Sequence, residues 1–157
     1  TQTLLDLYTI YKHYGRLDGL IVTLMGDHKY GRTIHSLVQA LDLFDTKINL
    51  IGPIDLKLPK KLYKERYLES VELTANIAMS TDVLYMTRVQ RERGAQGHYA
   101  LTRLDAENLP DNSIVMHPLP RIDELGDWFD TDPRAKYFEQ MSNGLAVRKF
   151  LLDRILG

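Results

Sequence analysis

The sequence has 157 residues, of which 20 are Lys or Arg and 21 are Asp or Glu, so its formal net charge is −1. This length suits one domain around a single core. The balanced charge excludes a general nucleic-acid or anionic-membrane binder, because both need a sustained basic excess. The absence of Cys excludes a disulfide framework, a thiolate metal site and a cysteine nucleophile, and it is compatible with a reducing cytosol.

The first predicted element is an amphipathic helix over 3–13. Thr3 is expected to cap it and Gly15 to end it. Four large apolar residues recur in it at helical spacing: Leu4, Leu5, Tyr8 and Tyr11. The chain starts at Thr1, directly before this helix, so we expect it to begin inside a longer protein.

A strand, a helix and a second strand are predicted next. Residues 19–25 form an almost unbroken apolar run with β-branched members, typical of a strand buried on both faces. After Gly31 the apolar positions return to helical spacing, and 47–51 predict another short strand. The charged stretch 57–72 predicts a further helix, with Pro59 limiting where it can start.

The rest of the chain continues this alternation. Residues 82–86 and 113–116 predict two more buried strands, and Asp132-Pro133 resembles a helix N-cap followed by proline. Asn143-Gly144 predicts a break before a last helix. Strands alternating with helices indicate an α/β fold, a doubly wound and mainly parallel sheet flanked by helices in a single domain. The two terminal helices have wide apolar faces, which either pack on the sheet or bridge to a domain outside this chain.

The loop after the first strand, 26–33, is predicted to bind an anion. It leads into a helix N-terminus, where free N–H groups are joined by Lys29 and Arg32. A solvated turn with Thr33 as the helix cap is the alternative. A nucleotide phosphate loop is a second alternative, which differs by one residue because Arg32 stands where that motif needs Lys. The bulky residues Asp27 to Tyr30 inside the loop disfavour it.

Two other loops follow predicted strands. After 82–86, extended backbone would place Arg88 and Gln90 on one side, where a planar guanidinium and an amide could grip a carboxylate or phosphate. The start of a charged surface helix is the alternative. In 116–121, Pro118 and Pro120 bracket one residue, so we expect an extended backbone that presents its carbonyls to a ligand.

In an open parallel sheet these loops meet beyond the carboxyl ends of the strands. Arg32, Arg88 and Gln90 together suit a small dianion with two acidic groups a few carbons apart. The histidines share no ligand spacing, so we expect no metal site, and no Ser-His-Asp arrangement or carboxylate pair is present for acid–base catalysis. Positioning and charge stabilisation are the expected contributions to any chemistry.

Four motifs in register resemble the aspartate transcarbamoylase catalytic chain: Thr1-Gln-Thr-Leu-Leu-Asp-Leu7, Gly26-Asp-His-Lys-Tyr-Gly-Arg-Thr-Ile-His-Ser36, Tyr85-Met-Thr-Arg-Val-Gln-Arg-Glu-Arg93 and His117-Pro-Leu-Pro-Arg121. The resemblance implies carbamoyl transfer from carbamoyl phosphate to L-aspartate in pyrimidine synthesis, without a cofactor, in a cytoplasmic homotrimer. The related ornithine enzyme is disfavoured, because its fingerprint has Cys where Pro118 stands here and lacks the Arg-x-Gln pair.

The resemblance also implies roles for single residues. Arg32 and Arg88 would grip the aspartate carboxylates, with Gln90 assisting. Gln2 would contact the carbamoyl group of carbamoyl phosphate, and the backbone carbonyls around Leu119 and Pro120 would receive the carbamoyl amide and the attacking amine. The expected supporting residues, which shape the site or its closing loop, are Lys29, Thr33, His117 and Arg93.

The resemblance covers only the aspartate-binding half of that catalytic chain. We expect residues 1–157 to form that domain, with the N-terminal carbamoyl-phosphate domain and its phosphate-binding loop outside the chain and little turnover without them. A non-catalytic module that binds a dicarboxylate or a protein partner is the alternative. His28 stands where the family usually has Leu.

Overall fold

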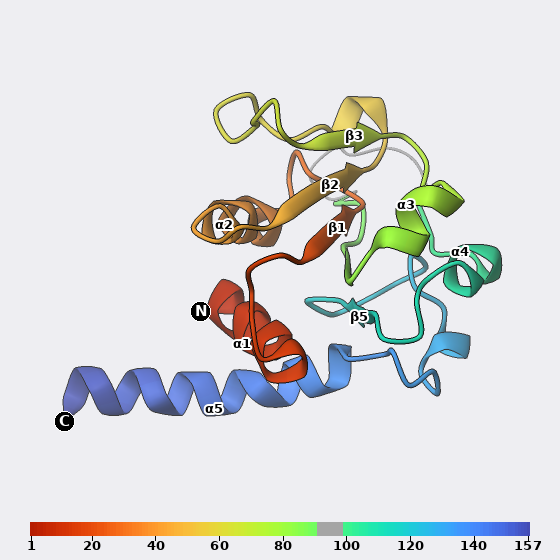
Figure 1. Cartoon of the computed structure of the whole chain (residues 1–157). Coiled ribbons are helices and arrows are strands. Elements are labelled where there is room, and N and C mark those ends of the chain that lie inside the picture. The colour runs from red at the N-terminus through yellow and green to blue at the C-terminus, as the bar shows by residue number, and fades with distance from the viewer. Residues whose placement is uncertain (91–98) are drawn as a thin grey trace.

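A computed structural model of the chain describes residues 1–90 and 99–157 and contains one parallel sheet. Its five strands lie in the order β3-β2-β1-β4-β5, and every neighbouring pair is parallel. The strands are β1 (Ile21–Met25), β2 (Lys47–Ile51), β3 (Leu68–Ser70), β4 (Val83–Met86) and β5 (Ile114–Met116). Figure 1 shows this sheet with helices on both faces, which confirms the predicted doubly wound α/β domain.

Helices cover the sheet in two layers. On one face lie α1 (Gln2–Tyr14) and α2 (Arg32–Leu41), and on the other the short α3 (Ala75–Ser80) and α4 (Arg103–Glu107). The long α5 (Tyr137–Leu156) lies against α1. Among the described residues, no helix is long and apolar enough to cross a bilayer.

Alternate side chains of the inner strands enter two separate cores. In β4, Val83 and Tyr85 belong to the core beneath α1 and α2, whereas Leu84 and Met86 belong to the core on the opposite face. All four are buried. This two-sided burial is why the strands read as continuous apolar runs in the sequence.

The first helix is one residue longer at its start than predicted. It begins at Gln2 with Thr1 at the N-cap and no side-chain capping bond, so the cap predicted at Thr3 is wrong. Its end is as predicted, because Gly15 adopts a left-handed conformation with φ 69° and its N–H bonds to the carbonyl of Tyr11.

The helix predicted within 57–72 is wrong. This stretch contains turns and the edge strand β3. Pro59 lacks the N–H that a helix interior needs. The charges serve a tertiary contact instead, because Lys64, Arg66 and Tyr67 all bond to the Asp42 carboxylate at the end of α2.

The helix start predicted at Asp132-Pro133 is also wrong. Those residues form a turn in which the Asp132 carboxylate accepts bonds from the N–H and guanidinium of Arg134, and α5 begins only at Tyr137.

The break predicted at Asn143-Gly144 does not occur, because α5 runs through it. Asn143 is buried and donates to the Thr9 hydroxyl of α1 at 3.0 Å. A Cβ on Gly144 would lie 3.2 Å from Leu5 of α1. The small and polar residues are therefore present to let two helices cross closely.

Candidate functional site

A pocket of about 270 Å³ opens at the carboxyl ends of β1, β4 and β5. The chain leaves β1 towards β2 on one side of the sheet, and β4 and β5 lie on the other side, so this is where the strand order reverses. Open α/β sheets bind ligands at such a point. The pocket is lined by Gln2, Gly31, Arg32, Thr33, Thr87, Arg88, Gln90, His117, Pro118, Leu119 and Pro120.

Most of the site residues predicted from the sequence meet in this pocket. The structure brings together Gln2, Arg32, Thr33, Arg88, Gln90, His117, Leu119 and Pro120. Lys29 is not among the lining residues; its ammonium lies 5.1 Å from the centre of the Tyr30 ring. Arg93 lies outside the described residues.

The loop after β1 is shaped by a glycine and a buried aspartate. Gly26 has φ 125°, and a Cβ there would lie 2.2 Å from the backbone oxygen of Thr87, so only glycine fits. The Asp27 carboxylate accepts bonds from the N–H groups of Lys29 and Tyr30 and from that of Gln90 at 3.1 Å. Asp27 thus ties the loop after β1 to the loop after β4.

These bonds count against the nucleotide phosphate loop considered from the sequence. A phosphate loop cradles its ligand with backbone N–H groups. Here two of those groups, from Lys29 and Tyr30, already donate to Asp27.

The loop after β4 presents two predicted side chains to one space. Arg88 and Gln90 both line the pocket, whereas Val89 between them is buried against Leu56. The predicted alternation is therefore confirmed. The hydroxyl of Thr87 in the same wall is buried and has no hydrogen-bond partner among the described residues.

The loop after β5 differs from the extended backbone that its two prolines predicted. Leu119 has φ 49°, in the left-handed region, and its peptide bond to Pro120 is cis. The N–H of Leu119 donates to Nδ1 of His117 at 2.9 Å, which folds the backbone back on the histidine. The prediction of extended backbone is wrong at this residue.

His117 is a buried positioning group for that loop. Because Nδ1 accepts a bond from Leu119, the proton lies on Nε2, which donates to the Glu124 carboxylate at 2.7 Å. Burial alone would raise the pKa of Glu124, but bonds from His117 and from the backbone outweigh it and hold that pKa below its usual value. Glu124 is 1% exposed, so its charge is stabilised by these donors rather than by water.

Sequence reasoning missed several residues that support the pocket from behind: Asp6, Asp27, Thr87, Glu124 and Gln140. A signal existed for Asp6, which stands on the buried face of α1 one turn before Thr9 and Ile10. A carboxylate at such a position rarely lacks partners. Glu124 and Gln140 carried no local signal.

The charge of the pocket suits an anion. Its described lining includes two arginines and no carboxylate. Paired guanidinium groups can capture carboxylates in a bidentate manner. In the described parts of the chain, no group of three His, Cys, Asp or Glu residues could hold a metal ion.

A family model described as "Aspartate/ornithine carbamoyltransferase, Asp/Orn binding domain" matches residues 18–155. The chain is 42% identical to the aspartate carbamoyltransferase catalytic subunit of Thermoplasma volcanium and 45% identical to that of Methanopyrus kandleri, in each case over 100% of this chain and 55% of the relative. The chain therefore spans about half the length of these curated relatives.

A solved structure shows the same similarity. Aspartate transcarbamoylase from Trypanosoma cruzi, in complex with aspartate and phosphate, superposes with a TM-score of 0.84 at 37% identity. The match covers 91% of this chain and 49% of that one. The fold and the half-length coverage thus agree between the sequence and structure comparisons.

Proposed function

The chain belongs to the aspartate/ornithine carbamoyltransferase family as an Asp/Orn-binding domain, and we propose that it is the aspartate-binding half of an enzyme that carbamoylates L-aspartate. In this reaction the amine nitrogen of aspartate bonds to the carbonyl carbon of carbamoyl phosphate. The C–O bond to phosphate breaks, phosphate leaves with the electron pair, and the amine loses a proton. The convergence of Arg32, Arg88 and Gln90 in one pocket supports this proposal most strongly.

The two arginines bind the two carboxylates of aspartate in this proposal. Arg32 is the first residue of α2, so the helix N-terminus adds its partial positive charge beside the guanidinium. Arg88 and Gln90 approach from the neighbouring strand end. The supporting residues Thr33, Lys29 and Arg93 act on the shape of the loops, and His117 positions the loop after β5.

Carbamoyl phosphate meets the opposite wall of the pocket. Gln2 and the backbone carbonyls near Leu119 and Pro120 face its carbamoyl group in this proposal, since all three residues line the pocket. The phosphate group needs further cations, which we assign to an N-terminal domain outside this chain. We further propose that the complete catalytic chain works as a cytoplasmic homotrimer without a cofactor.

Transfer by the complete catalytic chain tests this function. We expect it to form N-carbamoyl-L-aspartate from carbamoyl phosphate and aspartate. Radiometric or chromatographic detection of the product is the measurement. L-ornithine at the same concentration is expected to react at least about 10³-fold more slowly, because its side-chain ammonium would face Arg32 and Arg88. Equal rates with the two amino acids, or none with aspartate, would contradict the proposal.

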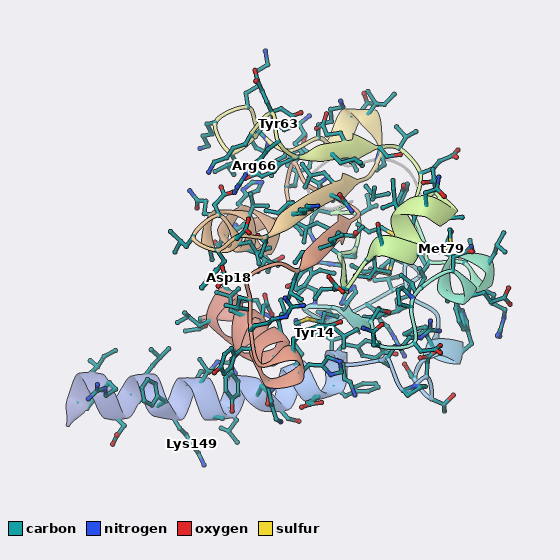
Figure 2. All side chains as sticks on the ribbon, in the orientation of Figure 1. Tyr14, Asp18, Tyr63, Arg66, Met79 and Lys149 are labelled. Carbon is teal, nitrogen blue, oxygen red and sulfur yellow. The ribbon has the colours of Figure 1, made fainter. Side chains whose placement is uncertain are left out.

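An apolar surface on α1 and α5 is proposed to dock the N-terminal domain. A hollow of about 470 Å³ is lined there by Leu4, Tyr8, Ala146, Val147, Phe150 and Leu151. Phe150 is 62% exposed. Figure 2 shows the side chains of this end of α5, Lys149 among them, standing clear of the rest of the molecule. The match covers only 55% of the relative, and we infer that the remaining part of such a catalytic chain, its N-terminal domain, occupies this surface.

Recombining separately produced halves tests this surface. The chain is expected to bind the N-terminal half in sedimentation velocity, and Phe150→Ser to weaken that binding at least about 10-fold, because a central apolar anchor is lost. Leu152→Ser is the matched control, since Leu152 is 57% exposed but lies outside the hollow. Self-association of this chain without binding of the other half would assign the surface to a second copy instead.

A further inference from the structure

A buried carboxylate behind the pocket, Asp6, joins three elements. It is 0% exposed on α1. Its Oδ1 accepts from Nε2 of Gln2 at 2.8 Å and from Nε2 of Gln140 on α5 at 2.7 Å. Its Oδ2 accepts from the hydroxyl of Tyr85 on β4 at 2.9 Å.

These bonds fix the orientation of both glutamine amides. An ionised carboxylate only accepts hydrogen bonds, so each amide must turn its NH₂ group towards Asp6 and its oxygen away. The outward oxygen of Gln140 accepts the backbone N–H of His117 at 2.9 Å. Gln2 lines the pocket, so its outward oxygen is an acceptor for a ligand there.

The loop after β5 also presents only hydrogen-bond acceptors to the pocket. The N–H of His117 donates to Gln140, and the N–H of Leu119 donates to the His117 ring. Pro118 and Pro120 have no N–H. The backbone from 117 to 120 therefore has only carbonyl oxygens left for a ligand.

We propose that Asp6 is a positioning residue that keeps this corner of the pocket purely accepting, and that the corner thereby selects a carbamoyl group over an acetyl group of the same shape. The carbamoyl NH₂ donates to Gln2 and to the loop carbonyls. An acetyl methyl in its place leaves those acceptors desolvated and unpaired, which is a strong basis for rejection. This inference rests on the proposed function and extends it from the identity of the acceptor to that of the donor.

The substitution Asp6→Asn tests the inference in the complete catalytic chain. The amide that this substitution introduces keeps one accepting oxygen and replaces the other by an NH₂ group, which needs an acceptor of its own. The oxygen of Gln140 is held by His117, so the candidates are the Tyr85 hydroxyl and the oxygen of Gln2, and we expect Gln2 to turn over and supply it. The NH₂ group of Gln2 then faces the pocket. We expect kcat/KM for carbamoyl phosphate to fall about 30-fold and that for acetyl phosphate to change less than about threefold, with aspartate as the common acceptor.

The assay is run at pH 8, because burial raises the pKa of Asp6 to about 6 and the wild-type carboxylate is ionised there. Asp42→Asn is the matched control. Asp42 also accepts a hydrogen bond from a tyrosine, but it lies at the opposite end of α2 from Arg32. In this control the ratio of kcat/KM for carbamoyl phosphate to kcat/KM for acetyl phosphate should therefore stay at its wild-type value. If Asp6→Asn does not fold, Asp6→Ser removes the charge with a smaller group and is expected to lower the ratio in the same direction.

The outcomes separate the two proposals. Absence of carbamoyl transfer by the wild-type chain overturns the proposed function and this inference together. Wild-type transfer with an unchanged donor ratio in a folded Asp6→Asn variant overturns this inference alone, as does an equal loss with both donors. Loss of the fold in both Asp6 variants, judged by circular dichroism, would make Asp6 a core residue and would also overturn it.

Discussion

Replacing Arg88 by Ala in the complete catalytic chain is expected to lower kcat/KM for aspartate about 10³-fold while the fold is retained. Arg88 is half-buried beyond the end of β4 and lines the pocket with Arg32. Loss of a desolvated guanidinium–carboxylate contact costs about 4 kcal/mol, which corresponds to that factor. Steady-state kinetics at varied aspartate, with circular dichroism to verify folding, provide the measurement.

Two further variants make the Arg88 result specific. Arg88→Lys should recover only part of the loss, because an ammonium cannot make a bidentate contact with a carboxylate. Arg103→Ala should leave kcat/KM unchanged, since Arg103 on α4 lies 4.6 Å over the Trp128 ring and outside the pocket. Near-wild-type turnover by Arg88→Ala would contradict the assignment of the aspartate site.

The second large effect concerns His28 and the dependence of stability on pH. Its side chain is 3% exposed, and Nε2 donates to the backbone oxygen of Leu24 at 3.0 Å. Burial lowers the pKa of His28 from 6.5 to about 4. Below pH 6.5, His28 therefore binds a proton in the unfolded chain, whereas in the folded chain it binds one only near pH 4. The stabilisation is complete above pH 6.5 and is lost as the pH falls towards 4.

Replacing His28 by Leu removes this acid sensitivity. Between pH 7 and pH 4, the free energy of unfolding of the wild-type chain should fall by about 3 kcal/mol more than that of His28→Leu. Urea denaturation of both proteins at several pH values measures the difference. Other groups whose pKa the fold shifts, such as Asp42 and Glu124, titrate in both proteins and cancel. His13→Leu, at an exposed position of α1, controls for removing a histidine, and parallel curves for wild type and His28→Leu would refute the prediction.

Much of the fold was predictable because its strands are short local patterns. Residues 47–51 are strand β2 with the predicted bounds, and 19–25 contain β1. In β1, burial on two faces leaves a run of apolar residues that can be recognised without knowledge of the neighbouring strands, and in β2 buried apolar residues stand on either side of Asn49. The wrong predictions come from residues whose role is tertiary. The charges of 57–72 serve the end of α2, and Asn143 serves the contact with α1.

The candidate site divides in the same way. Arg32, Arg88 and Gln90 were predictable because a parallel sheet gathers the residues after its strands at one edge. The bond from Gln140 to Asp6 was not, since it joins α5 to α1 across nearly the whole chain. The turn at Leu119 was also missed, because it depends on which nitrogen of His117 accepts a bond. The types of residue at loop positions can be predicted from the sequence, whereas the buried hydrogen bonds that orient their side chains and backbone cannot.

The reversal of strand order also has a kinetic meaning. Val22 in β1 pairs with Ile48 on one side and with Val83 on the other, so the second pairing closes a loop more than twice as long as the first. The extra entropy of closure is only about 0.8 kcal/mol, but non-local pairings slow folding. The β1–β4 pairing beneath the pocket is thus the less local of the two pairings that β1 makes. A ligand held there binds only the finished domain, and it stabilises the whole sheet by mass action.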